Sequence, residues 1–143
     1  MGDTGRAGQD LENLVQHAVE QGILDDQFIQ LRNLQDDSNP DFVKDLIGLY
    51  YSDASSKINS IQQMLKGDGI DFQHLDAIVH QFKGSSASFG ASEMTKICIE
   101  FRDACQSNDA ERCRYICGCM STAYMRLQDI LKEFERLEQL QKS

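Results

Sequence analysis

The sequence predicts an all-α protein, built as an antiparallel four-helix bundle that two short N-terminal helices cap. Its 143 residues include a single proline, and helix-forming residues are abundant whereas strand patterns are scarce. Apolar residues recur at the three- and four-residue spacing of amphipathic helices. Short turn sequences separate the longer periodic segments, as in antiparallel bundles. A chain of this length corresponds to one ordinary domain, so we assign residues 1–143 to a single domain.

The two capping helices are placed within about residues 10–36. Residues 1–9 are small and polar, and we expect them to be loosely ordered. Helical periodicity begins at Asp10 and stops at Gly22, a residue type that commonly ends helices. A second, shorter pattern opens at Asp25, because aspartate favours helix starts.

The bundle itself is placed at about residues 40–139. The break DDSNP precedes it, and Pro40 suits the first position of a helix. The turn sequences KGDGID, GAS and QSND then divide the rest of the chain into four helices. We expect these helices at about residues 40–65, 71–89, 92–105 and 110–139.

The last of these helices carries a heptad pattern over roughly three repeats. Its apolar residues alternate steps of four and three: Cys113, Cys117, Met120, Tyr124, Leu127, Leu131 and Phe134. Such a seam forms either an intermolecular coiled coil or one wall of an antiparallel bundle. The short turns between the other helices favour the bundle, and we expect a monomer.

The acidic composition excludes several classes of function. The net charge is −9 and the pI is about 4.7, so the surface repels nucleic-acid backbones and anionic membranes. Neither a signal-peptide core nor a transmembrane run is found in the sequence, so we expect a soluble intracellular protein. Five cysteines without a secretory signal indicate free thiols in a reducing compartment.

The stretch VHQFKGSSASFGA, residues 79–91, has an unusual composition for a helix. Glycine costs about 1 kcal/mol relative to alanine in a helix, and serine is also a poor helix former. At about 100° per residue the apolar positions share one face, whereas His80 lies roughly 140° from Leu75 and points outward or to a flank. Residues three and four apart are neighbours on a helix, so Lys83 and Gly84 adjoin His80.

This arrangement suits a phosphoacceptor. A neutral imidazole is a nucleophile and is largely unprotonated at neutral pH, so His80 can accept a phosphoryl group. Lys83 would offset the charge of that group, and Gly84 would leave room for a partner's active site to close over the imidazole. Residue spacing leaves two plainer interpretations open: a solvated histidine on a polar helix face, and a glycine and serines that serve close helix packing.

The segment HQFKGSSASFGA closely resembles the signature of histidine-containing phosphotransfer (HPt) proteins, whose core is His-x-x-Lys-Gly. The longer form His-Gln-x-Lys-Gly-Ser-Ser-x-Ser is similar to the plant branch, which works in cytokinin-type multistep phosphorelays. The resemblance extends over the whole chain through its length, its acidity and the segment DDQFIQLRNLQDDSNPDFVKDLI. Phe82 and Phe89 depart from it, because smaller aliphatic residues are expected there. Relatives that lack the histidine resemble decoys, and His80 is present.

The resemblance implies a phosphorelay carrier rather than an enzyme. His80 would accept a phosphoryl group from the receiver-domain aspartate of a hybrid sensor histidine kinase and pass it to the aspartate of a response regulator. Magnesium (Mg²⁺) would belong to the acidic pocket of the receiver domain, so no metal or other cofactor is assigned to this chain. No nucleotide-binding motif is found, which argues against ATP-dependent kinase activity. Family members shuttle between cytoplasm and nucleus, and both locations are expected here.

The docking surface for these partners is expected around His80. Its candidate residues come from the His80 helix and from the second capping helix: Gln81, Lys83, Phe28 and Leu31. The two from the capping helix fit core positions equally well. Arg102, on the helix that follows, either approaches the phosphate or is simply solvated.

Two other classes of function compete with the carrier. The cluster CRYICGC could bind a metal or serve redox chemistry, but its spacing differs from the Cys-x-x-Cys of structural zinc sites, and cysteine is often a small core hydrophobe. Regulation by oxidation of a solvent-facing Cys119 fits the sequence better than metal binding. The other alternative is a helical adaptor that uses the final heptad helix as a coiled coil and carries no phosphate.

Overall fold

The computed structural model describes residues 2–142, with side chains from Arg6 onward, and these residues form six helices and no strand. The all-α prediction is therefore confirmed. The helices are α1 (Gly2–Glu20), α2 (Asp26–Asn33), α3 (Phe42–Met64), α4 (Phe72–Phe89), α5 (Ser92–Gln106) and α6 (Ala110–Lys142).

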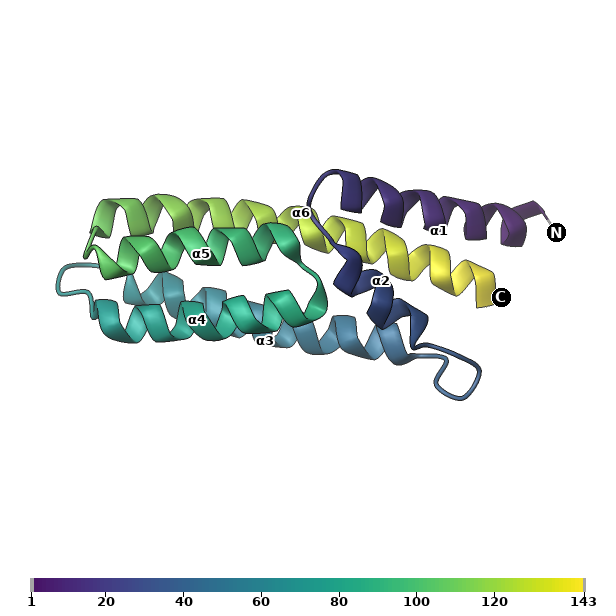
Figure 1. The fold of residues 1–143 in the computed structure, drawn as a ribbon, viewed down its shortest axis with the longest axis horizontal. Helices are drawn as coiled ribbons and strands as arrows, with labels where there is room; N and C mark the ends of the chain where they lie inside the picture. The colour runs from purple at the N-terminus through teal and green to yellow at the C-terminus, as the bar shows by residue number, and fades with distance from the viewer. Residues whose placement is uncertain (1, 143) are drawn as a thin grey trace.

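Helices α3, α4, α5 and α6 form the antiparallel four-helix bundle (Figure 1). α4 and α5 make a tight hairpin, α5 packs on α6, and α3 closes the bundle against α4 and α6. α3 and α6 continue past the end of the α4–α5 hairpin. There α1 lies alongside the C-terminal part of α6, and α2 packs against α3 and α4. The two N-terminal helices thus cover one end of the bundle.

The first helix is longer than predicted. It starts at Gly2, so the expectation of loose order is wrong for residues 2–9, while Met1 lies outside the described residues. The apolar stripe of α1 includes Ala7, which is 2% exposed, and Leu11, which is 1% exposed. Because α1 packs along α6, burial of these side chains orders a segment that is polar in composition.

Glycine and aspartate residues set the ends of several helices. Gly22 follows α1 with a positive φ of 74°, as expected for a helix-ending glycine. The side chains of Asp25 and Asp71 accept hydrogen bonds from backbone N–H groups in the first turns of α2 and α4. The prediction that Pro40 occupies the first position of a helix is wrong. α3 begins at Phe42, and the proline lies in the turn before it.

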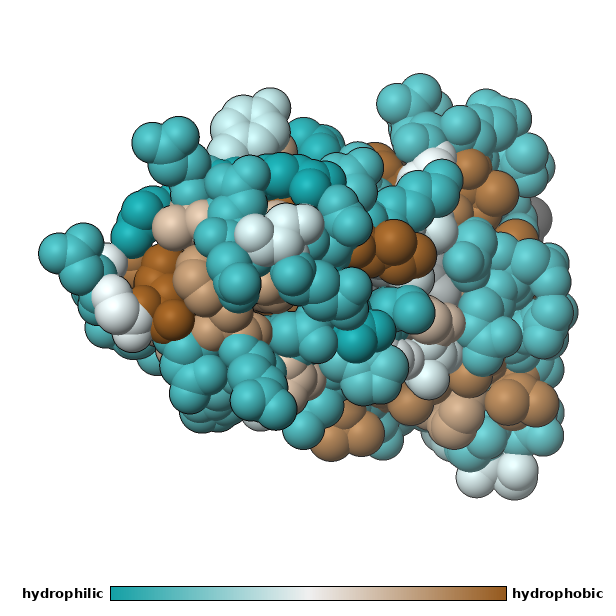
Figure 2. Space-filling view, turned by 60° about the vertical axis from the view of Figure 1, so that its left-hand side comes forward, coloured by the Kyte–Doolittle hydropathy of each residue, from teal (hydrophilic) through white to brown (hydrophobic). Residues whose placement is uncertain are grey.

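The heptad residues of α6 lie inside the molecule. All are buried except Tyr124, which is partly buried against the core. α6 packs on α1, α3 and α5 of the same chain, so the seam is a wall of the bundle. Packing within one chain therefore accounts for the heptad pattern that suggested a coiled-coil adaptor. The surface around this core is mainly hydrophilic, and Figure 2 shows one face on which apolar side chains form small, separate patches.

The turn between α4 and α5 makes a close contact with α2. Gly90 has a φ of 90°, and a Cβ atom added there would lie 2.3 Å from the backbone nitrogen of Phe28. The backbone nitrogen of Asp25 donates a hydrogen bond to the Gly90 carbonyl at 3.0 Å. Beside this contact the rings of Phe28 and Phe89 pack with centroids 5.5 Å apart. The missing side chain of Gly90 therefore lets α2 seat on the end of α4.

We expect Gly90→Ala to lower the free energy of unfolding by about 2–4 kcal/mol, because alanine is strained at positive φ and its Cβ would force a backbone shift. The matched control is Gly118→Ala in α6, where an added Cβ meets nothing within 4 Å. That substitution should raise the free energy of unfolding by about 0.5–1 kcal/mol. Urea unfolding followed by circular dichroism measures both, and equal effects would contradict the close approach at Gly90.

Candidate phosphoacceptor site

Helix α4 presents His80 to solvent because its opposite face is fixed in the core. That inner face consists of Leu75, Val79, Phe82, Ser86 and Phe89, all buried. His80 is exposed, as the helical arithmetic predicts, and its side chain makes no hydrogen bond or ion pair with any residue in the range 2–142. The imidazole is therefore open to a partner.

Lys83 and Gly84 lie one turn beyond His80 on α4. Lys83 is partly buried, and within the described chain its ammonium group has no ion pair or hydrogen bond. Its charge acts on the thiol of Cys98, which places it on the α5 flank of α4. Gly84 is exposed, and an added Cβ would meet nothing within 4 Å. Packing within the chain therefore does not account for this glycine.

The serines of the motif do serve helix packing. Ser86 is fully buried, and its hydroxyl oxygen lies 2.9 Å from that of Tyr50 in α3. Burial raises the pKa of Tyr50, so the phenol stays protonated and can donate or accept in this bond. Ser85 donates a hydrogen bond to Asp53 of α3 at 2.8 Å. The serines thus join α3 to α4, whereas Gly84 leaves the outer face of α4 bare.

The two phenylalanines that depart from the family pattern belong to the same α3–α4 contact. The rings of Phe82 and Phe89 stack on Tyr50 with centroids 6.3 and 4.5 Å away. Phe82 is fully buried and Phe89 is 5% exposed. Both therefore fill the core and leave the outer face of α4 unchanged.

Arg102 of α5 is bound by a carboxylate of α4. Its Nε and Nη2 atoms donate to the two carboxylate oxygens of Asp76 at 3.0 and 3.2 Å. These hydrogen bonds raise the pKa of Arg102. Because Asp76 precedes His80 by one helical turn, Arg102 lies near the candidate site, in an ion pair and not simply solvated.

The other docking candidates divide between core and surface. Gln81 is exposed on α4. Phe28 is only 1% exposed, and its ring packs against Phe89 and Phe134 with centroids 5.5 Å apart in each case. The structure therefore places Phe28 in the core, where a partner does not reach it. Leu31 is partly buried and remains accessible.

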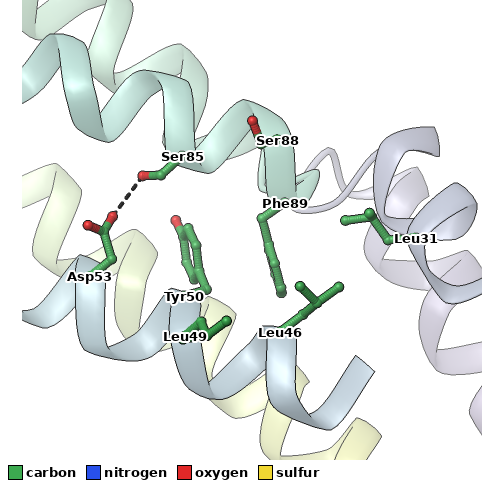
Figure 3. A pocket seen from close by; sticks show the side chains of 8 residues that line it. All are labelled: Leu31, Leu46, Leu49, Tyr50, Asp53, Ser85, Ser88 and Phe89. Atoms are coloured by element: carbon green, nitrogen blue, oxygen red, sulfur yellow. Dashed lines mark hydrogen bonds between the residues drawn. The ribbon is translucent and has the colours of Figure 1, made fainter. Parts of the chain in front are cut away.

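A cavity of about 420 Å³ opens between α2, α3 and α4 (Figure 3). Its walls are mainly apolar, with a carboxylate and two serines: Leu31, Leu46, Leu49, Tyr50, Asp53, Ser85, Ser88 and Phe89. The Phe89 ring projects from α4 towards Leu46 of α3, and Leu31 faces it from α2. Leu49 remains 69% exposed. Leu46 and Leu49 are not predicted from the sequence, because both fit the apolar pattern of α3 and resemble core residues.

The cysteines lie mainly in the core. Cys98, Cys105, Cys113 and Cys117 are buried as free thiols, and Cys119 is partly buried. Burial raises the pKa values of Cys98 and Cys105 to about 12, which keeps both thiols protonated at neutral pH. The part of the chain that the structure describes contains no group of three or more His, Cys, Asp and Glu side chains placed to hold a metal ion.

Comparison with known proteins identifies the family. The Hpt domain family matches residues 45–141. Histidine-containing phosphotransfer protein 4 of Arabidopsis thaliana is 48% identical over 117 residues, which cover 82% of this chain and 84% of that protein. The crystal structure of the histidine-containing phosphotransfer protein MtHPt2 from Medicago truncatula aligns with a TM-score of 0.88 at 34% identity, over 93% of this chain and 90% of that one. The chain therefore belongs to the histidine-containing phosphotransfer family.

Proteins of this family carry phosphoryl groups in two-component phosphorelays, and this chain is a plant-type histidine phosphotransfer protein. A rice protein named Pseudo histidine-containing phosphotransfer protein 2 is also 36% identical over 118 residues, covering 82% of this chain and 78% of that protein. Overall similarity thus extends to proteins with both names, which makes His80 itself the residue to test. Across residues 2–142, none of the helices combines the length and apolarity that crossing a membrane requires.

We expect only Cys119 to react rapidly with a thiolate-specific aromatic disulfide reagent at neutral pH, and all five cysteines to react after denaturation. Because burial raises the pKa of Cys98 and Cys105 in the folded state, the unfolded thiols ionise first as the pH rises above about 9. Alkaline pH should therefore weaken the fold. Absorbance of the released reagent with and without denaturant counts the thiols. More than one fast thiol in the native protein would contradict the burial of the other four.

Proposed function

We propose that His80 is the phosphoacceptor of this carrier. It receives the phosphoryl group from the receiver-domain aspartate of a hybrid sensor histidine kinase and passes it to the aspartate of a response regulator. The supporting observation is an exposed imidazole that has an unpaired ammonium group and an open glycine within one turn of α4. Gly84 costs helix stability without any internal contact that requires it, and because it lies one turn from His80 we propose that it makes room for the partner.

The transfer exchanges one bond to phosphorus for another. A ring nitrogen of neutral His80 attacks the aspartyl phosphate, the N–P bond forms as the P–O bond to the aspartate breaks, and the aspartate leaves as a carboxylate. Transfer to the response regulator runs through the same bonds in reverse. The ammonium group of Lys83 offsets the charge of the phosphoryl oxygens. Mg²⁺ prefers oxygen ligands, so it belongs to the carboxylates of the receiver domain, and we assign no metal or other cofactor to this chain.

The receiver domain is proposed to dock over His80 and the cavity between α2, α3 and α4. Gln81 adjoins the imidazole, and α4 continues from it to the cavity wall at Ser85. The cavity accepts an apolar side chain of the partner, which would cover Leu31 and the exposed Leu49. Burial of such a side chain favours association even though the protein is acidic.

The remaining properties follow from this role. The motif of the plant branch supports a place in cytokinin-type signalling. Without a nucleotide-binding motif the protein is proposed to carry phosphate without kinase activity of its own. We place it in the cytoplasm and the nucleus as a monomer that binds neither nucleic acid nor membranes, in keeping with its net charge of −9.

Phosphotransfer from a phosphorylated receiver domain tests the role of His80. Wild type should take up phosphate that is acid-labile and base-stable, and His80→Gln should take up none, because an amide is not a nucleophile. Lys83→Ala should slow the transfer roughly tenfold or more. The matched control is His74→Gln, since His74 is an exposed histidine of the same helix. Phosphate uptake by His80→Gln, or its loss in His74→Gln, would overturn the assignment.

A larger side chain at position 84 should separate stability from function. Gly84→Gln should raise the free energy of unfolding by about 0.5 kcal/mol, because glutamine is the better helix former. It should slow phosphotransfer roughly tenfold or more, since displacement of the partner by about 1 Å is enough for such a loss. Gly118→Gln is the control, because Gly118 is also exposed, helical and free of contacts at its Cβ position. Equal transfer rates for the two variants would show that no partner closes over Gly84.

A further inference from the structure

The ion pair between Asp76 and Arg102 lies beside His80 but has no part in the function proposed above. Asp76 precedes His80 by four residues on α4, and side chains at this spacing are neighbours. Arg102 reaches it from α5 with two hydrogen bonds of 3.0 and 3.2 Å. The two side chains are 22% and 27% exposed, so solvent and a partner can reach the pair.

On α4, His80 lies between Asp76, which Arg102 contacts from α5, and Lys83. Arg102 contacts α4 at Asp76, one turn before His80. Lys83 follows His80 by three residues, and its charge acts on Cys98, which lies one turn before Arg102 on α5. A phosphoryl group on His80 would therefore have Arg102 on one side and Lys83 on the other. The charge of Lys83 is unpaired, whereas that of Arg102 is masked by a carboxylate.

We infer that Asp76, by pairing with Arg102, reduces the electrostatic stabilisation that Arg102 gives to a phosphoryl group on His80. Asp76 thereby shifts the equilibrium between the phosphorylated and the free carrier. The inference rests on the proposed role of His80. Asp76 is a positioning residue here, because it acts through the guanidinium group and through its own charge and does not touch the reacting atoms.

Phosphorylation changes what competes for the guanidinium group. A phosphoryl group adds between one and two negative charges near neutral pH, and arginine binds phosphate oxygens and carboxylates with the same planar fork. In the free carrier Asp76 is the acceptor at hand. In the phosphorylated carrier the phosphoryl oxygens compete with it, and the carboxylate repels them. Asp76 thus lowers the stability of the phosphorylated form.

This opposition suits a carrier, which must release the phosphoryl group as well as accept it. Two unmasked cations beside His80 would stabilise the phosphohistidine and hinder transfer to the next aspartate. One unmasked cation, Lys83, and one masked cation, Arg102, keep the phosphohistidine closer in energy to the aspartyl phosphates on either side of it.

The test measures the equilibrium of phosphoryl exchange between a phosphorylated receiver domain and the full chain. Asp76→Asn removes a like charge and frees Arg102, so it should raise the equilibrium constant for phosphorylation of His80 by roughly three- to tenfold at low ionic strength. Added salt should shrink this increase. Asp76→Glu restores the carboxylate and should stay within about twofold of wild type, since it changes the length of the side chain and not its charge.

A matched control comes from the adjacent residue of α5. Asp103 pairs with Arg112 of α6 at 2.7 Å, so Asp103→Asn makes the same chemical change in an ion pair that does not involve α4. It should leave the exchange equilibrium within about twofold of wild type, because Asp103 pairs with Arg112 and not with Arg102, so its loss does not free the guanidinium group beside His80. Arg102→Gln should lower the equilibrium constant, since Asp76 then acts without its counterion.

Each outcome decides the inference. An unchanged or lowered equilibrium constant in Asp76→Asn, or an equal rise in Asp103→Asn, would overturn it and leave the pair as a fastening between α4 and α5. If Asp76→Asn does not fold by circular dichroism, the opposite shift expected for Arg102→Gln carries the test. If wild type accepts no phosphate, the function proposed for His80 fails first. If wild type is phosphorylated and His80→Gln is not, the proposed function stands. An equilibrium constant that the Asp76 variants leave unchanged then counts against this inference alone.

Discussion

The hydrogen bond between the buried hydroxyls of Tyr50 and Ser86 fixes the rotation of α4, and the exposure of His80 depends on that rotation. Rotation of α4 about its axis would break this bond, because Tyr50 lies on α3 and Ser86 on α4. A buried hydroxyl left without its partner costs about 1–3 kcal/mol. The rings of Phe82 and Phe89 stack on the same tyrosine and oppose rotation in the same way. The hydrogen bond of Ser86 and the ring packing of Phe82 and Phe89 therefore favour the same orientation of α4, in which the imidazole of His80 faces outward.

The electrostatics of the site differ from those of the whole molecule. The chain carries a net charge of −9, which repels a phosphoryl group at long range. At short range Lys83 supplies an unpaired positive charge beside His80, and Arg102 supplies one that Asp76 masks. The net charge of this chain therefore does not attract the phosphoryl group, and we expect contact at the docking surface to supply affinity. The cavity beside Leu49 offers the apolar area for such a contact.

Features that depend on local spacing could be predicted from the sequence, and features that depend on contacts between helices could not. The outward position of His80 could be predicted from helical periodicity, and glycine and aspartate signals predict several of the helix boundaries. The helix that begins at Gly2 packs against α6 at the other end of the chain, where Ala7 and Leu11 are buried. Phe28 is in the core because α2 seats on the end of α4. The partner of Arg102 lies on a different helix, so no spacing rule identifies Asp76 as its acceptor.

A carrier must present one reactive group to two kinds of partner, and a rigid helix meets this requirement better than a mobile loop. The ends of α4 are fixed by the cap at Asp71 and by the close approach at Gly90, and its inner face is fixed by the core. The exposed face of α4 can then carry residues that are poor helix formers at a small cost in the free energy of unfolding. Gly84 lowers stability by about 0.5–1 kcal/mol, against a typical total of about 5–15 kcal/mol for a domain. Because the bundle holds α4 in place without help from its outer face, that face is free to be shaped by the partners it has to fit.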